Sequence, residues 1–218
     1  MTSARPTFLD DIPDDAIALL ILAHGAGAAM DSAFMTAITE ALNAHAIGVL
    51  RFEFDYMSAR RTGGPRRPPP KIDQLCEAYL DVVRRVGAEF GTDVTLLIGG
   101  KSLGGRVASM IADKASNVAG VVCLGYPFHP AGKPATLRTA HLAALTTPTF
   151  ILQGTRDALG SQDEVASYAL AASIDICWLA DGDHDLKPRK RSGFSHDDHI
   201  ASAAEAIARF ARRLATAP

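Results

Sequence analysis

The sequence has few cysteines, no excess of charge and no long hydrophobic run. Its three cysteines, Cys76, Cys123 and Cys177, lie far apart in apolar segments. This pattern is typical of free thiols in a reducing compartment, not of a disulfide framework or a metal site. The longest uninterrupted apolar run, Ala16–Ala23, has 8 residues, too few to span a membrane. Residues 1–6 contain no apolar signal core. We therefore expect a cytoplasmic protein with no membrane partner.

Charge is nearly balanced, with 22 Lys and Arg against 24 Asp and Glu and a formal net charge of −2. No overall field favours nucleic acid, so no nucleic-acid partner is expected. A composition of 48% hydrophobic and 21% charged residues excludes a disordered, collagen-like or coiled-coil chain. One core can serve a chain of 218 residues. We expect residues 1–218 to form a single domain.

Short apolar runs alternate with segments of helical period, which predicts βαβ units and a mainly parallel sheet of about six to seven strands with helices on both faces. The predicted strands are Ala16–Ala23, Ile47–Phe54, Val94–Gly99, Val118–Gly125, Pro148–Gly154 and Ile174–Ala180. Helices are predicted over Phe34–Leu42 (with Asp31 as cap), Leu75–Phe90, Arg106–Lys114 and Ile200–Leu214, from about Ser161, and near Leu137. In such a sheet, ligands bind outside the carboxyl ends of the strands. The loops that follow the strands are therefore where catalytic residues are expected.

The most informative of these loops contains Gly100-Lys101-Ser102-Leu103-Gly104, a G-x-S-x-G sequence between a predicted strand and a predicted helix. This pattern resembles the nucleophile elbow of α/β-hydrolases, in which a strained turn lifts the serine hydroxyl clear of the sheet. Glycine is needed two residues to either side because helix and strand approach closely there. Ser102 is the candidate nucleophile.

A phosphate-binding loop is the competing interpretation, since Gly100-Lys101-Ser102 resembles the end of G-x-x-x-x-G-K-S. That pattern needs glycine at position 95, which is Thr95 within the predicted strand. The remaining residues leave too little loop to surround a phosphate. The nucleotide-binding interpretation is therefore disfavoured.

A serine nucleophile needs a base to take its proton and an acid to orient that base, in the chain order Ser, acid, His for this fold. The strand Pro148–Gly154 leads to Asp157, and the last strand leads to His184. Both follow strands in the required order, so Asp157 and His184 are the candidate acid and base. Asp163 is the fallback acid, and His196 and His199 are the competing bases.

Two backbone amides should form the oxyanion hole, one from the residue after the nucleophile and one from a loop after an earlier strand. Leu103 follows Ser102, and His24-Gly25-Ala26-Gly27 follows the strand Ala16–Ala23. We assign the donors to Leu103 and Ala26. Gly25 and Gly27 are the alternatives for the second donor and are expected to line the substrate site. His24 is expected to be structural.

A metal site is the alternative use of the acidic and histidine residues near the C-terminal end. They are Asp181, Asp183, His184, Asp185, His196, Asp197, Asp198 and His199. Their spacing offers no clearly placed third ligand, and acidic residues at a helix start are favoured by the helix dipole. Neither a metal nor a cofactor is expected.

Several segments resemble the small α/β-hydrolases related to dienelactone hydrolases. More closely, they resemble bacterial relatives of the testis-expressed and histone-acetyltransferase-complex-subunit hydrolase-like proteins. The segments are His24–Ala28, Arg66–Pro70, Gly99–Ala108, Gly125–Pro130, Ile151–Gly154 and His184–Pro188. The resemblance implies a lidless α/β-hydrolase fold with the triad as assigned above. Dienelactone hydrolases use a cysteine nucleophile, whereas position 102 is serine, so dienelactone is not the expected substrate.

Two basic loops are expected beside the site. They contain Arg60, Arg61, Arg66, Arg67 and Lys71, and Lys187, Arg189, Lys190 and Arg191. A basic rim, with Arg66 and Arg67 in contact with substrate, would favour an anionic ester, whereas a solvated loop paired with nearby acids is the alternative. Tyr126 and His129 are expected to line the site, with a packing role as the alternative. The short connection after Gly125 leaves no room for a cap domain.

These residues together predict a serine hydrolase that cleaves a small carboxylic ester or thioester. Ser102 is the nucleophile, His184 the base and Asp157 the acid. The alternative is a non-catalytic protein-interaction scaffold that retains the fold.

Overall fold

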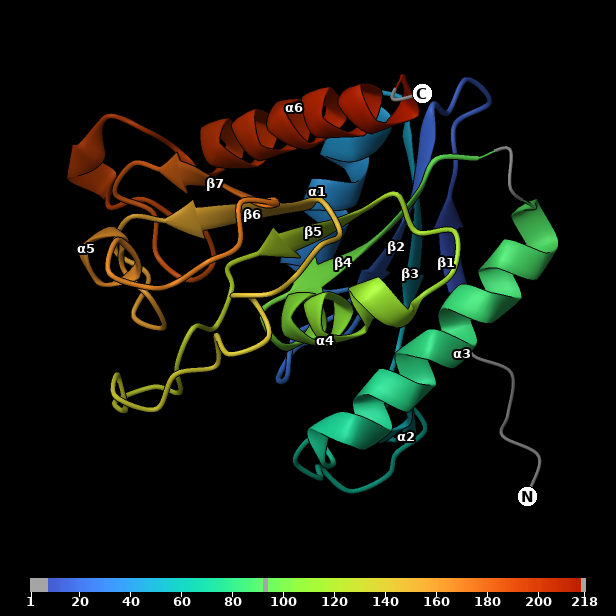
Figure 1. Cartoon of the computed structure of the whole chain (residues 1–218), viewed down its shortest axis with the longest axis horizontal. Helices are drawn as coiled ribbons and strands as arrows, with labels where there is room; N and C mark the ends of the chain where they lie inside the picture. Colours follow the sequence, from blue (N-terminus) through green and yellow to red (C-terminus); the bar gives the residue numbers. More distant parts are fainter. Residues whose placement is uncertain (1–7, 92–93, 217–218) are drawn as a thin grey trace.

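The computed structural model describes residues 8–91 and 94–216, and its strands form one sheet in the order β1-β3-β2-β4-β5-β6-β7 (Figure 1). The strands are β1 (Phe8–Asp11), β2 (Ala18–Ala23), β3 (Ile47–Phe52), β4 (Leu96–Lys101), β5 (Gly120–Leu124), β6 (Thr149–Gly154) and β7 (Ile174–Leu179). All neighbouring strands are parallel except β1, which is antiparallel to β3. The order reverses between β2 and β4, so this is the switch point at which ligands bind in open sheets.

Helices cover both faces of the sheet (Figure 1). They are α1 (Ala33–Asn43), α2 (Asp55–Arg61), α3 (Ile72–Phe90), α4 (Leu103–Ile111), α5 (Gln162–Val165) and α6 (His196–Ala215). One hydrophobic cluster joins α1 and α6 to one face of the sheet, and the other joins α3 and α4 to the opposite face. The central strands are buried on both sides, which explains their continuously apolar sequence.

The predicted fold class is confirmed, because the six predicted strands and the βαβ order are all present. Strand β1, an edge strand of four residues with two aspartates, was not predicted from the sequence. Its burial alternates only weakly, and half of its residues are acidic, so it gives no apolar run. In the sheet order, β3 and β2 separate this antiparallel edge strand from β4.

The prediction of a helix near Leu137 is wrong. Residues 125–148 form turns and bends, and Leu137 is exposed. Pro127, Pro130 and Pro134 lack the backbone N–H that a helix needs. No cap domain is present in this connection, as expected.

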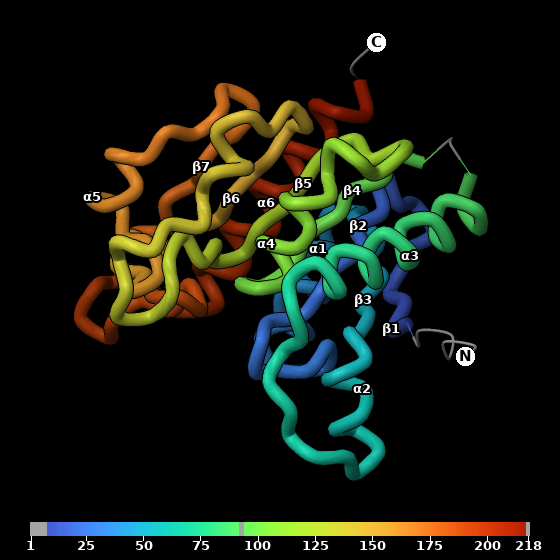
Figure 2. The backbone as a smooth tube through the Cα atoms, turned by 60° about the horizontal axis from the view of Figure 1, so that its bottom comes forward, coloured from blue at the N-terminus to red at the C-terminus, as the bar shows by residue number. Residues whose placement is uncertain are grey.

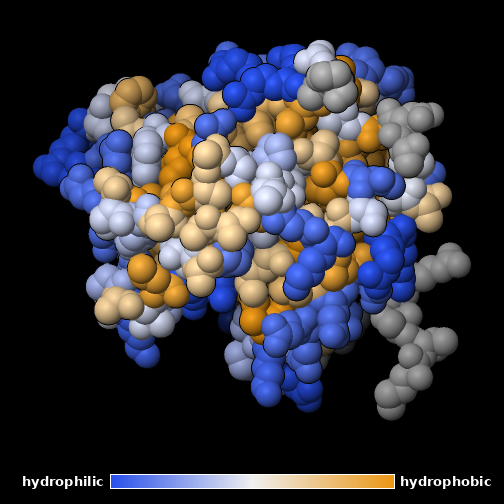
Figure 3. Space-filling view, in the orientation of Figure 1, coloured by the Kyte–Doolittle hydropathy of each residue, from blue (hydrophilic) through white to orange (hydrophobic). Residues whose placement is uncertain are grey.

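Helix α2 was not predicted, because its residues belong to a stretch that looked like a basic loop. Asp55 in its first turn and Arg60 and Arg61 in its last turn complement the helix dipole and could have indicated it. The tube in Figure 2 shows α2 and the chain that follows it extending from the body of the molecule. Hydrophilic residues cover this projection (Figure 3).

The helix starts differ from the predictions in detail. Ser32, not Asp31, is the residue before α1, and Asp31 pairs instead with Arg61 at 2.8 Å. Ser161 begins α5 as expected, in a capping box with Glu164. Helix α4 begins at Leu103, directly after the candidate nucleophile and three residues earlier than predicted.

The three cysteines are free; Cys123 is buried and the other two are half-buried. No helix within residues 8–91 or 94–216 combines the length and apolarity needed to cross a membrane. The expectation for residues 1–6 lies outside the described residues.

Close packing of α4 on β2 requires glycine at position 104. A Cβ atom there would lie 2.5 Å from the Ala23 carbonyl oxygen and 2.8 Å from the Ala23 Cβ. Both contacts are with backbone or a β-carbon, which cannot move aside without shifting the strand. Position 104 therefore sets how near the start of α4 lies to the sheet.

We expect Gly104→Ala to lower the free energy of unfolding by about 1–3 kcal/mol, the usual cost of overpacking. The matched control is Gly87→Ala within α3, where a Cβ would meet nothing within 4 Å. That change should stabilise the protein by roughly 0.5–1 kcal/mol. Urea denaturation measures both, and equal effects of the two substitutions would contradict the packing argument.

Candidate active site

Ser102 lies in a strained turn between β4 and α4. Its backbone has φ 51° and ψ −110°, values that serine rarely adopts. Its backbone N–H donates to the Leu124 carbonyl of the neighbouring strand at 2.9 Å. The strand thus holds Ser102 at its carboxyl end while the helix turns away, which leaves the side chain at the sheet edge.

The structure brings Ser102, His184 and Asp157 together. His184 Nε2 lies 2.8 Å from Ser102 Oγ, and His184 Nδ1 lies 2.8 Å from Asp157 Oδ2. A carboxylate can only accept, so Nδ1 carries the proton and Nε2 accepts from the serine hydroxyl. The histidine side chain is 28% exposed, and the aspartate side chain is fully buried. One end of the array is therefore open to substrate.

Asp157 is held by more than the histidine. The Leu159 N–H donates to Oδ1 at 2.8 Å, and Gln153 Nε2 donates to Oδ2 at 2.9 Å. A buried carboxylate is costly unless hydrogen bonds satisfy it, and here three donors surround it. Asp157 is therefore fixed in one orientation toward His184.

Gln153 was not identified as a site residue by sequence reasoning. It is fully buried, and its Oε1 accepts from the Tyr126 N–H at 2.6 Å. Its Nε2 also lies 3.1 Å from the carbonyl oxygens of Tyr126 and Gly160. The one available signal was a polar residue in the apolar run of β6, next to the candidate acid loop.

Lys101 anchors the loop that carries His184. Its Nζ donates to the His184 carbonyl at 2.7 Å and lies 3.1 Å from Asp185 Oδ1. The same nitrogen lies 5.4 Å from the centre of the Phe34 ring. Burial lowers the pKa of Lys101, although the nearby Asp185 carboxylate acts in the opposite direction. The lysine in the elbow motif thus fixes the backbone of the candidate base.

Two of the acidic residues considered as metal ligands, Asp181 and Asp183, have structural partners. Asp181 pairs with Arg156 and Arg189, and Asp183 Oδ1 accepts the N–H groups of Asp185 and Lys187. These contacts shape the turn that presents His184.

The competing bases also have partners, and both are at the start of α6. His196 Nε2 lies 2.9 Å from the Asp185 carbonyl, and His199 Nδ1 lies 2.7 Å from that of Leu186. Asp198 forms the capping box of α6 with Ser195. Neither histidine takes the place of His184 beside Ser102.

The loop after β2 lies beside Ser102. A Cβ on Gly25 would be 3.9 Å from the Ser102 Cβ, while Ala26 and Gly27 are exposed. Leu103 is the first residue of α4, so its amide has no partner within the helix. The geometry therefore suits the predicted donors, Leu103 and the loop at Ala26.

The side chains of His24 and Tyr56 hydrogen-bond to the backbone carbonyls of this loop. His24 Nε2 accepts from the Phe54 N–H at 3.2 Å, so Nδ1 donates to the Gly25 carbonyl at 2.6 Å. Burial lowers the pKa of His24 and keeps it in this neutral form. The Tyr56 hydroxyl donates to the carbonyls of Gly25 and Ala26 at 3.4 and 3.3 Å. Since burial raises the pKa of Tyr56 to about 12, it remains a donor.

Tyr126 and His129 do not line the site. Their exposed fractions are 0% and 2%. The Tyr126 ring packs on Phe128, and its hydroxyl lies 3.3 Å from His141 Nε2. His129 Nε2 faces Glu164 at 3.5 Å. The expectation of substrate contact is wrong for both side chains because the loop after β5 folds inward.

The basic residues divide into two groups. Arg61 pairs with Asp31 and Glu53, and Arg189 pairs with Asp181, as the solvated-loop alternative proposed. Arg66 and Arg67 are exposed and form no ion pair within the described part of the chain. Arg66 and Arg67 are therefore free to meet an anion, as are the exposed Lys187, Lys190 and Arg191.

We expect Gln153→Leu to lower the free energy of unfolding by about 3 kcal/mol, since it leaves the Tyr126 N–H without its buried partner and removes a donor from Asp157. Exposed Gln162→Leu is the control and should change it by less than about 0.5 kcal/mol. Urea denaturation gives both values. A Gln153→Leu protein as stable as the control would contradict the buried network.

Burial, together with the nearby Arg106 charge, lowers the pKa of His141 to about 4 from 6.5. The unfolded chain therefore binds a proton at His141 before the folded chain does, and this residue destabilises the fold as pH falls from about 6.5 to 4. His141→Asn should remove this part of the pH dependence, whereas His45→Asn should retain it. The test is the urea midpoint of unfolding, measured for both variants between pH 4 and 7. If the midpoint changed with pH equally in the two variants, the role assigned to His141 would be contradicted.

Residues 16–212 match a family model described as the alpha/beta hydrolase domain. Similar solved structures include a dienelactone hydrolase from Anabaena variabilis (18% identity, TM-score 0.70, 97% of this chain and 93% of that chain). Another is an α/β serine hydrolase without a lid from Xanthomonas campestris (20%, 0.67, 97% and 90%). A third is an esterase domain from Rhodothermus marinus (18%, 0.66, 96% and 99%). At these identities the structures show the shared fold, and the family match over most of the sequence shows more: this chain belongs to the alpha/beta hydrolase domain family.

Proposed function

We propose that this protein is a serine hydrolase that cleaves a carboxylic ester or thioester through an acyl-enzyme. The observation that carries the proposal is the pair of 2.8 Å hydrogen bonds that joins Ser102, His184 and Asp157. A strained, partly exposed serine at the end of that array supports a nucleophilic role. The similar structures described as serine hydrolases or esterases agree with it.

In the first half-reaction Ser102 Oγ attacks the carbonyl carbon while His184 Nε2 takes its proton. Asp157 accepts the hydrogen bond from Nδ1–H and stabilises the imidazolium. When the tetrahedral intermediate collapses, His184 returns the proton to the leaving alcohol or thiol, which leaves an acyl group on Ser102. A water molecule then repeats the sequence and releases the acid. Every step uses groups of this chain and the two reactants.

The amides of Leu103 and the loop at Ala26 stabilise the oxyanion in this mechanism. One such donor contributes about 3–4 kcal/mol to the transition state. Gly25 and Gly27 leave the loop without side chains beside the carbonyl oxygen. The Tyr56 hydroxyl bonds the carbonyls of Gly25 and Ala26, which stiffens the loop and keeps its amides available.

The exposed charges of Arg66 and Arg67 support a preference for an ester with an anionic group.

The free cysteines of the protein support a location in a reducing compartment, the cytoplasm. Within the family we place the chain nearest the testis-expressed and histone-acetyltransferase-complex-subunit branch, on the motifs described above. A non-catalytic scaffold with this fold is the second candidate, and the complete triad argues against it.

We expect Ser102→Ala to reduce ester and thioester hydrolysis at least ~10³-fold, because the remaining oxyanion donors cannot replace the nucleophile. A fluorophosphonate probe should label the wild-type protein at Ser102 and fail to label this variant. Ser116→Ala, at an exposed position, is the matched control and should behave like the wild type.

Equal hydrolysis rates for Ser102→Ala and wild type would contradict the catalytic assignment. A folded wild-type protein that reacts with neither probe nor esters would favour the scaffold instead.

A further inference from the structure

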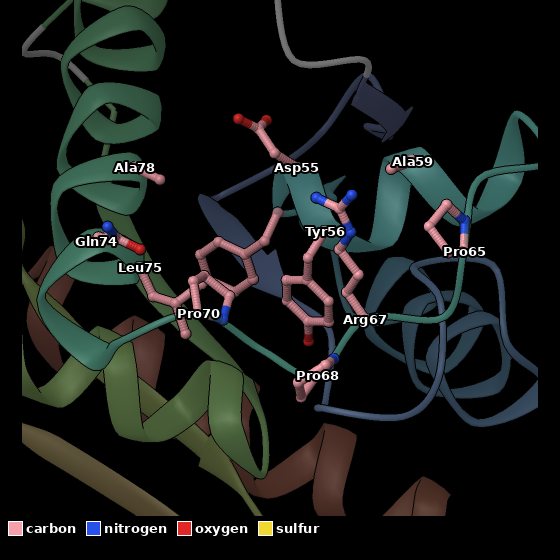
Figure 4. Close-up of a pocket in the computed structure, with 11 residues that line it drawn as sticks. Asp55, Tyr56, Ala59, Pro65, Arg67, Pro68, Pro70, Gln74, Leu75 and Ala78 are labelled. Carbon is pink, nitrogen blue, oxygen red and sulfur yellow. The ribbon is translucent and has the colours of Figure 1, made fainter.

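A cavity of about 600 Å³ lies between α2, α3 and the chain that joins them (Figure 4). Its lining residues are mostly apolar: Phe54, Asp55, Tyr56, Ala59, Pro65, Arg67, Pro68, Pro70, Gln74, Leu75 and Ala78. Figure 4 shows the Tyr56 ring pointing toward Pro68, with the Arg67 side chain beside it and the Asp55 carboxylate directed away. The volume is within the range of small-molecule sites.

The cavity adjoins the loop after β2 through Tyr56. The Tyr56 ring forms part of its wall, while the hydroxyl of the same side chain contacts the carbonyls of Gly25 and Ala26. Gly25 in turn lies against Ser102. One side chain therefore separates the apolar space from the loop expected to hold the substrate carbonyl oxygen.

The topology indicates which half of the ester faces this cavity. His184 and Asp157 follow β7 and β6, on one side of β4 in the sheet, whereas α2 and α3 follow β3 on the other side. The leaving group must lie near His184 Nε2 to receive its proton. The acyl group then extends in the opposite direction, over the loop after β2 and toward Tyr56.

We propose that this cavity is the acyl-binding subsite, and that the preferred substrates carry an apolar acyl group larger than acetyl, such as an aryl-acetyl or branched alkyl chain. This inference rests on the proposed function. Apolar walls from Phe54, Tyr56 and Leu75 supply the burial that such a group gains on binding. A small acyl group would leave most of the space unused.

The wall formed by residues 65–70 is held in place before any ligand binds. Its prolines restrict the backbone, and Arg60 Nη2 donates to the Arg67 carbonyl at 2.5 Å. The Arg60 guanidinium also lies over the Tyr56 ring, 5.4 Å from its centre. A preformed wall costs little ordering on binding, which favours a defined acyl group.

The test compares kcat/KM for 4-nitrophenyl phenylacetate and 4-nitrophenyl acetate, which share a leaving group and differ by one phenyl ring. We expect the wild type to prefer the phenylacetate by at least about tenfold. Ala78→Phe, which fills the cavity from α3, should lower this preference about tenfold. Ala88→Phe is the matched control, on an exposed position of the same helix, and should keep the wild-type preference.

A second measurement uses the unmodified protein. Benzylboronic acid and methylboronic acid mimic the two acyl groups, and the benzyl compound should inhibit about tenfold more strongly. The subsite would be overturned if the wild type preferred neither phenylacetate over acetate nor the benzyl over the methyl boronic acid. It would also be overturned if Ala78→Phe and Ala88→Phe had the same ratio of kcat/KM for the two esters. If Ser102→Ala hydrolysed both esters at the wild-type rate, the proposed function itself would fail, which is a separate result.

Discussion

The common direction of strands β2, β4, β6 and β7 is the constraint on which the rest of the structure depends. Their carboxyl ends meet at one edge of the sheet, so residues separated by up to 83 positions lie within hydrogen-bond distance there. The apolar strands are buried between two helical layers, and this burial fixes the edge. Chemistry is then determined by the few residues that immediately follow each strand.

Buried polar side chains, surrounded by the apolar core, fix the positions of the candidate catalytic groups at that edge. Gln153 fixes the acid, Lys101 fixes the backbone of the base, and Tyr56 fixes the loop beside the nucleophile. A buried polar group is costly unless its hydrogen bonds are made, and each of these three makes several. The hydrogen bonds that these buried side chains require therefore also orient the candidate catalytic residues.

Much of the fold and the triad could be predicted from sequence because both depend on local pattern. Continuous apolar runs identify buried parallel strands, and the glycines around Ser102 reflect a steric need that any such turn shares. Chain order then places Asp157 and His184. The edge strand β1 and the helix α2 escaped prediction because short polar segments carry weak periodicity.

Side-chain direction could not be predicted in the same way. Tyr126 and His129 follow a strand as the triad residues do, but the loop after β5 turns them into the core. Gln153 and Lys101 lie in strands, where a sequence gives no sign of which backbone groups they will meet. The cavity beside Tyr56 likewise arises from segments that only the folded chain brings together.

The central claim concerns a covalent step at one oxygen atom. Brief reaction with 4-nitrophenyl acetate, followed by acid quenching, proteolysis and mass spectrometry, locates the acyl group directly. We expect an acetyl group on Ser102 Oγ that disappears on further incubation at neutral pH. Release of nitrophenol with no acetylated peptide, or with the acetyl group on neighbouring Lys101 instead, would contradict it.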